Sequence, residues 1–268
     1  MRDWIARWIV TSKRPHQVPD RGHRGGVISM HRALAHFRLG PMNLLTSLSL
    51  FVAFTVVWLV LLPGICHFWT RFLAWCIDRL PVRGTLEVAV HHFRYLTLEI
   101  PYLRIYAILP SLLTWSLTCA ATLLLFGVTF FVSKELVPVI YMARSVLLIQ
   151  TTALVYFALW PVSFPHTPDS YMEGLMTANM GLISVVPLLF ALTYYIFDFG
   201  LRKKAFLTAI TMAHLIIFLP FQVLLQALVL QKTVLFMPLL YIIFGMPLEV
   251  LFIIAFYSWG MTWAFRTP

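Results

Sequence analysis

Long runs of apolar residues recur along the chain, and they are long enough to cross a lipid bilayer as helices. A spanning helix needs about twenty apolar residues, because the hydrocarbon core of a bilayer is about 30 Å thick. Apolar side chains make up 60% of the 268 residues and charged ones only 11%, which excludes a water-soluble domain. We therefore predict an all-α fold, a polytopic membrane bundle of about six transmembrane helices. The predicted spans are residues 44–63, 106–132, 136–161, 175–199, 206–230 and 234–259.

Residues 1–43 are polar and strongly basic, and they form a predicted cytoplasmic tail before the membrane domain, residues 44–268. Apolar residues at helical spacing predict two surface helices in this tail, over residues 4–10 and 29–39. A basic amphipathic helix that carries Trp on its apolar face is typical of helices that lie on an anionic leaflet. We therefore expect the tail to contact the lipid bilayer.

The segment of residues 64–105 is too charged to cross the membrane as one helix. It contains two stretches in which apolar residues recur at helical spacing, one over residues 68–80 and one over residues 86–96, with Pro81 and Gly84 between them. We predict two amphipathic helices at the membrane interface, or one interfacial helix and one that dips into the bundle.

The distribution of charge predicts which side of the membrane each end of the chain faces. With six spans, the N-terminal tail, the turn at Arg202, Lys203 and Lys204, and the C-terminal end share one side, which holds most of the Lys and Arg. Cytoplasmic loops are enriched in these residues, so both ends are predicted to be cytoplasmic. Topology thus explains the net charge of +10, and we expect no nucleic-acid partner. The compact chain with short loops favours a bacterial inner membrane as the setting.

Ionisable residues inside predicted spans are candidates for a functional site, because charge in hydrocarbon is costly. Arg144, His214 and Glu249 lie at a similar depth, roughly 12–15 Å from the predicted cytoplasmic face. Equal depth predicts a shared intramembrane polar cluster, which Gln150, Gln222 and Gln226 extend toward the outer side. Two interpretations stay open. The cluster is an ion pathway or substrate site, or it is an Arg144–Glu249 pair that holds helices together, with His214 as a hydrogen-bond partner.

The last predicted span, residues 234–259, contains three residues that disfavour a straight helix. Pro238 and Pro247 lack a backbone N–H, and Gly245 weakens a helix interior. We therefore expect kinks in this span.

Histidines and acids gather in the predicted outer loops, where an enzyme site would face the outside. These residues are His67, His91, His92, Glu99, His166 and Asp169. Their spacing matches no zinc signature, and the adjacent His91 and His92 cannot both point to one side of a helix. We expect neither a metal nor a cofactor, and regard His92, His166 and Asp169 as weak candidates for catalysis.

Three functions are compatible with these features. The absence of a specific catalytic motif, together with the basic tail and the segment 64–105 as contact surfaces, favours a non-enzymatic multi-pass subunit of a larger envelope complex for transport, export or assembly. Its expected partners are other membrane or peripheral protein subunits. A stand-alone transporter or channel would instead use the polar cluster. An enzyme that acts on a lipid-linked substrate at the outer face would use the loop histidines.

Overall fold

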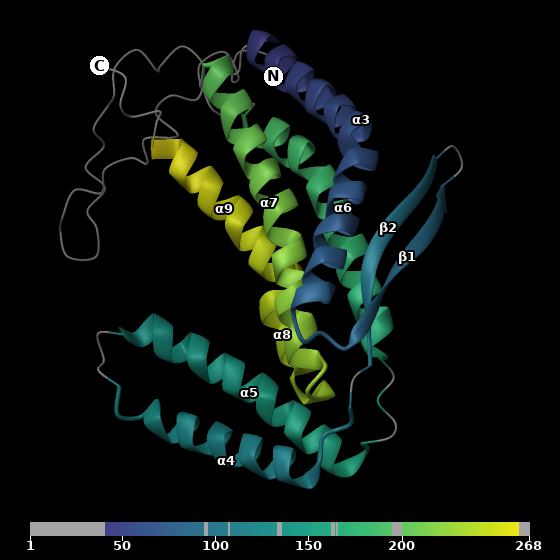
Figure 1. Cartoon of the computed structure of the whole chain (residues 1–268). Coiled ribbons are helices and arrows are strands. Elements are labelled where there is room, and N and C mark those ends of the chain that lie inside the picture. Colours follow the sequence, from purple (N-terminus) through teal and green to yellow (C-terminus); the bar gives the residue numbers. More distant parts are fainter. Residues whose placement is uncertain are drawn as a thin grey trace, which may run out of the picture.

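The fold is described from a computed structural model of the chain (Figure 1). The structure describes residues 41–93, 96–106, 108–132, 136–161, 164, 166–194 and 200–262. The surface helices predicted over residues 4–10 and 29–39 lie outside these residues.

Helices form most of the described chain, and one pair of strands follows the first of them. The elements are α3 (Pro41–Arg79), β1 (Gly84–Phe93), β2 (Leu96–Ile105), α4 (Leu112–Val128), α5 (Val137–Leu159), α6 (Pro168–Tyr194), α7 (Leu201–Leu230), the 3-10 helix η3 (Val234–Phe236), α8 (Met237–Phe244) and α9 (Met246–Met261).

Within the described residues, five helical segments are long and apolar enough to cross a membrane: α3, α5, α6, α7 and the stretch from η3 to α9. These helices confirm the predicted all-α membrane bundle and identify an integral membrane protein. The run predicted over residues 106–132 contains α4, whose 17 residues extend about 25 Å, less than the thickness of the hydrocarbon core. The run predicted over residues 44–63 is only the first half of α3, which extends about 58 Å.

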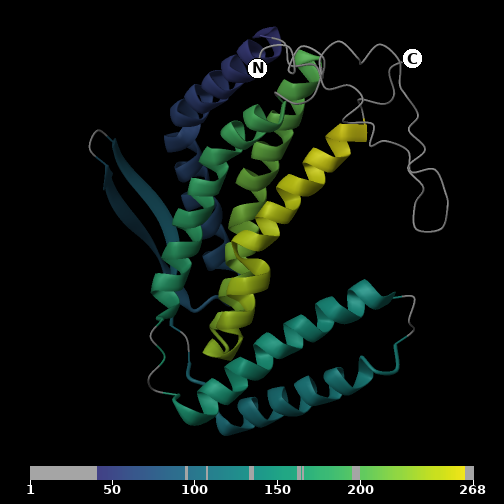
Figure 2. The same ribbon diagram turned by 180° about the vertical axis from the view of Figure 1, so that it is seen from behind.

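Helices α3, α6, α7, α8 and α9, which we call the bundle, lie side by side (Figures 1 and 2). Two tryptophans of α3 tie it to its neighbours, because Trp58 Nε1 donates to Ser184 Oγ of α6 and Trp69 Nε1 donates to the Ile216 carbonyl of α7, both at 2.8 Å. The start of α3, the end of α6, the start of α7 and the end of α9 lie toward the same end of the bundle (Figure 1).

Strands β1 and β2 form an antiparallel hairpin, with Gly84 opposite Ile105 and Phe93 opposite Leu96. The helix predicted over residues 86–96 is therefore wrong. The interfacial helix predicted over residues 68–80 is helical, but it is the second half of α3 and not a separate element.

The hairpin forms because β2 has one apolar face to bury. Pro101, Leu103 and Ile105 alternate along the strand and are buried, while Arg104 between them is exposed. This period of two places apolar residues on one face of a strand, which here packs against α3 and α6. The hairpin also contains Val, Thr and Ile, which are residue types that suit a strand better than a helix.

Helices α4 and α5 form an antiparallel pair that lies across the direction of the bundle (Figures 1 and 2). Trp115 Nε1 of α4 donates to the Leu154 carbonyl of α5 at 2.9 Å. The second half of α5 packs against η3 and α8, and it buries Leu154 and Phe157. Of the residues of α4, all of which the structure describes, only Thr122 is buried. The pair is therefore joined to the bundle mainly through α5.

Candidate functional site

A break in the last apolar run separates α8 from α9 at Gly245, as the sequence predicted. Each helix has a proline at its second position, Pro238 in α8 and Pro247 in α9. Pro247 cannot donate a hydrogen bond to the preceding turn, and its ring would collide with that turn in a continuous helix. A Cβ atom at Gly245 would lie 2.3 Å from the Tyr241 carbonyl oxygen, so the break needs glycine at this position.

Two glutamines of α7 bind the backbone carbonyls that the break exposes. Gln222 Nε2 donates to the carbonyls of Phe244 and Gly245, and Gln226 Nε2 also donates to Phe244. The Tyr171 hydroxyl of α6 donates in turn to Gln226 Oε1. Both glutamines and Tyr171 are buried. Irregular backbone at membrane depth is tolerated where protein groups satisfy it, and these side chains do so here.

Glu249 lies in the first turn of α9, beside the break, and only 1% of its surface is exposed. Both of its carboxylate oxygens are buried without a hydrogen-bond partner among the described residues. The N-terminus of a helix favours negative charge, so α9 offers Glu249 partial electrostatic compensation. No hydrogen-bond donor or basic side chain in the described ranges contacts this carboxylate.

His214 lies on the same face of α7 as the two glutamines, because His214, Phe218, Gln222 and Gln226 follow one another at intervals of four residues. The centroid of its ring is 4.8 Å from that of Phe252 and 5.0 Å from that of Phe256, both of α9. Among the described residues, His214 Nε2 is buried without a partner. Glu249 precedes Phe252 by three residues and Phe256 by seven, so it lies on the face of α9 that carries these two rings toward α7.

Arg144 does not join them. Its Nε donates to Thr129 Oγ1 at 3.1 Å, and its guanidinium lies 4.7 Å from the centre of the Phe130 ring, at the end of α4. The structure thus brings two of the three predicted cluster residues to one interface and keeps the third within the pair α4–α5. The predicted equality of depth assumed parallel spans, whereas α4 and α5 lie across the bundle.

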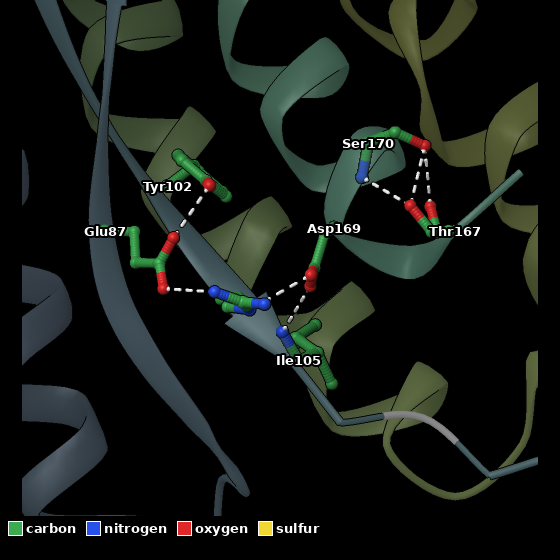
Figure 3. Close-up of polar contacts among 7 residues, drawn as sticks. Glu87, Tyr102, Ile105, Thr167, Asp169 and Ser170 are labelled. Atoms are coloured by element: carbon green, nitrogen blue, oxygen red, sulfur yellow. Dashed lines mark hydrogen bonds and ion pairs between the residues drawn. The ribbon is translucent and has the colours of Figure 1, made fainter.

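Asp169, a weak catalytic candidate, anchors the hairpin to the start of α6 (Figure 3). Its carboxylate is 3.1 Å from Arg104 Nε of β2 and accepts a hydrogen bond from the backbone N–H of Ile105 at 3.2 Å. Arg104 Nη1 also binds Glu87 Oε1 of β1 at 2.8 Å, and the Tyr102 hydroxyl donates to Glu87 Oε2 at 3.0 Å. We call Glu87, Tyr102, Arg104 and Asp169 the hairpin clamp.

The charges of the hairpin clamp shift the pKa values of its members. Hydrogen bonds from Arg104 and then Tyr102 hold the pKa of Glu87 below its ordinary value. The same carboxylate raises the pKa of Arg104 above its ordinary value. At neutral pH Glu87 and Arg104 are therefore both charged, and their ion pair joins β1 to β2.

The other outer-loop candidates have separate surroundings. The His166 ring contacts Phe164, with ring centroids 5.9 Å apart. His91 Nε2 is 3.3 Å from Thr177 Oγ1 and 3.9 Å from Glu173 Oε1 of α6. His92 lies in β1, and its side chain is outside the described part of the structure. Among the described residues, no three His, Cys, Asp or Glu side chains lie together in a way that could hold a metal ion.

Sequence reasoning missed the part played by Tyr171 and Asn179 of α6. Tyr171 completes the hydrogen bonds at the break. Asn179 is fully buried, and both polar atoms of its side chain lack a partner among the described residues. A buried amide in a predicted span is a detectable signal, because polar residues are rare there. No protein-family model matches the chain, and neither a curated protein nor a solved structure matches it.

Proposed function

We propose that this protein is a non-enzymatic multi-pass membrane subunit of a larger envelope complex that serves transport, export or assembly. The observation that supports this proposal is the exposed apolar surface of α4 and α5, which lie across the bundle (Figure 2). Leu113 and Leu117 of α4 are 71% and 62% exposed, and Leu148 of α5 is 66% exposed.

The direction of α4 and α5 favours a protein partner that packs against their exposed apolar surface. If α3, α6 and α7 cross the membrane along their length, α4 and α5 extend sideways from the bundle. Extensive exposed apolar surface is typical of contact sites with other proteins or with lipid. A neighbouring membrane subunit that packs against α4 would bury both helices of the pair.

The proposed setting is a bacterial inner membrane with both ends of the chain in the cytoplasm. The shared end of the bundle supports this orientation, because the start of α3, the end of α9 and the basic residues Arg202 and Lys203 lie there. In this orientation the basic N-terminal tail contacts the anionic leaflet and the cytoplasmic face of partner subunits.

Purification of the tagged, full-length protein from its native membrane in a mild detergent tests the proposal. We expect one or more proteins to copurify in a fixed ratio, as identified by mass spectrometry and gel filtration. A monodisperse preparation that contains only this chain, from membranes solubilised under several mild conditions, would contradict the proposal.

A stand-alone transporter is the second candidate, and the break between α8 and α9 favours it. Discontinuous helices with buried polar groups at membrane depth form the binding sites of many transporters. Here the break is bound by Gln222 and Gln226 and lies one helical turn from the buried Glu249. The test is to reconstitute this chain alone in lipid vesicles and to measure ion or substrate flux across their membrane. Flux that is present in the wild type and lost in Glu249→Gln would favour this candidate over the first.

A further inference from the structure

Helices α6, α7 and α9, which pack together, each carry a buried polar side chain with at least one atom that has no partner in the described part of the chain. These atoms include both carboxylate oxygens of Glu249, the Oε1 atom of Gln222 and both amide atoms of Asn179. The exposed fractions of the three side chains are 1%, 2% and 0%. Each pair of these three helices is in contact. Most buried polar groups in proteins are hydrogen-bonded, so orphaned polar atoms on three helices that pack together require an explanation.

Two contacts between α7 and the stretch from α8 to α9 show at which level along the bundle axis Glu249 lies. On one side of Glu249, Gln222 binds the carbonyls at the break. On the other side, the Phe218 and Phe252 rings have centroids 4.9 Å apart. Glu249 lies between Gly245 and Phe252 in the sequence, so its level on α7 is between Gln222 and Phe218.

Asn179 reaches the same level from α6. The hydrogen bond from Tyr171 to Gln226 fixes the register of α6 against α7, which run in opposite directions. Asn179 follows Tyr171 by eight residues, and Phe218 precedes Gln226 by eight residues, a rise of about 12 Å in each case. Asn179 therefore lies near the level of Phe218, as Glu249 does.

Within the described part of the chain, no basic side chain forms an ion pair with Glu249. On the helices packed against α9, the titratable groups nearest in level are His214 of α7, Glu173 and Tyr171 of α6, and Tyr241 of α8. His214 is surrounded by Phe218, Phe252 and Phe256. Glu173 faces His91 of the hairpin, and Tyr171 is bound to Gln226. An isolated, buried carboxylate without a counter-charge is strongly unfavourable.

We propose that Glu249 binds a monovalent cation, a proton or a sodium ion, with Gln222 and Asn179 supplying neutral amide oxygens as further ligands. A proton makes Glu249 a carboxylic acid that can donate to an amide oxygen. A sodium ion is bound by oxygen ligands from the carboxylate and the amides. In both cases the ion neutralises the buried charge beside the break in the last run, a place where transporters bind coupling ions.

This inference is independent of the proposed subunit function. It concerns the interior of the bundle, whereas the proposed partner surface lies on α4 and α5. A failure to find a partner leaves the ion site intact, and a failure to find the ion leaves the partner surface intact.

Infrared difference spectroscopy of the full-length protein in detergent tests the site. Purified wild type is titrated with acid or alkali, and separately with sodium chloride against choline chloride at fixed pH. We expect a carboxylic-acid carbonyl band that is absent in Glu249→Gln and present in Glu173→Gln, whose exposed carboxyl is the matched control. If Glu249→Gln fails to fold, Glu249→Asp keeps the carboxyl and shifts the band.

The titration that abolishes the carboxylic-acid band shows whether the bound ion is a proton or a sodium ion. Loss of the band at alkaline pH with no effect of sodium identifies a proton site. Loss of the band on addition of sodium, but not choline, identifies a sodium site. A spectrum without a band from Glu249, with no response to sodium, would overturn the proposal, as would a band that never changes with either titration.

Discussion

The carbonyl oxygen of Tyr241 leaves no room for a side chain at residue 245. In Gly245→Ala the new Cβ would meet a backbone atom at 2.3 Å, which cannot move aside as a side chain would. We expect the free energy of unfolding in detergent to fall by roughly 1–3 kcal/mol, the usual effect of forced overpacking. Thermal unfolding followed by circular dichroism measures this change.

Gly181→Ala in α6 is the matched control for this substitution. A Cβ atom at Gly181 has no neighbour within 4 Å, and alanine favours a helix over glycine by about 1 kcal/mol. This variant should unfold at the wild-type temperature or slightly above it. Equal effects of the two substitutions would contradict the close packing at the break.

The hydrogen bond between Tyr171 and Gln226 is expected to stabilise the break from the side of α6. In Tyr171→Phe the amide oxygen of Gln226 loses the hydroxyl that donates to it in a buried site, which destabilises the fold by about 1–3 kcal/mol. A double-mutant cycle with Gln226→Leu should give a coupling energy of about 0.5–3 kcal/mol. Additive effects of the two substitutions would show that the side chains act separately.

Individual polar residues could be identified from the sequence, but their partners could not. His214 and Glu249 stood out as ionisable residues in apolar runs, and His214 contacts Phe252 of α9, the helix that carries Glu249. Arg144 stood out in the same way, yet its partner is Thr129, fifteen residues away in the adjoining helix. The depth of a residue along a span gives only its position along the membrane normal. Which helices surround Arg144 depends on the direction of α5 relative to the bundle.

At the scale of elements, the hairpin clamp links the stability of the hairpin to pH. Because the pKa of Glu87 is lowered in the folded protein, its charge stabilises the hairpin fully above the ordinary pKa of glutamate. This contribution is lost as the pH falls through the lowered pKa. We expect hydrogen exchange of the β1 and β2 amides, corrected for its intrinsic pH dependence, to accelerate over that acidic range.

Glu87→Gln should remove most of this pH dependence, because it abolishes the charge that Arg104 binds. Glu99→Gln is the matched control, since Glu99 is an exposed glutamate on the neighbouring strand of the same hairpin. If the two variants keep the same pH profile as the wild type, the ion pair with Arg104 does not hold the hairpin.

The helices were easier to predict than the hairpin, for a physical reason. A run of twenty apolar residues has few alternatives to a membrane helix, and the two prolines around Gly245 exclude a straight one. In residues 86–96 the apolar residues fit helical spacing and strand alternation equally well. The Val and Thr residues of β1 and the Thr and Ile residues of β2 favour strands, and the buried face of β2 against α3 and α6 decides the outcome.

At the scale of the whole molecule, the pair α4–α5 differs from the bundle in what surrounds it. The bundle helices α6 and α7 bury half of their most apolar stretches within the chain, whereas α4 buries Thr122 alone. Hydropathy does not report this difference, because the helices of the pair and those of the bundle are all strongly apolar. The sequence therefore predicted the class of the fold, an all-α membrane bundle, but not the arrangement of its helices.

The last prediction concerns the surface that α4 offers to a partner. The substitutions Leu113→Gln and Leu117→Gln add polarity to side chains that the chain itself leaves exposed, so they should barely change unfolding of the bundle. They should, however, weaken a subunit that packs there, because a polar amide without a partner is unfavourable in an apolar interface. We expect the amount of copurified partner to fall severalfold in mild detergent.

Leu45→Gln and Leu48→Gln in α3 are the matched controls, since both leucines are exposed to a similar degree on a helix of the bundle. If α4 contacts a subunit and this part of α3 contacts lipid, only the α4 variants lose the partner. Equal losses from both helices would mean that the substitutions act through the membrane and not through a protein contact. Retention of the partner in all four variants would instead place the contact on another surface.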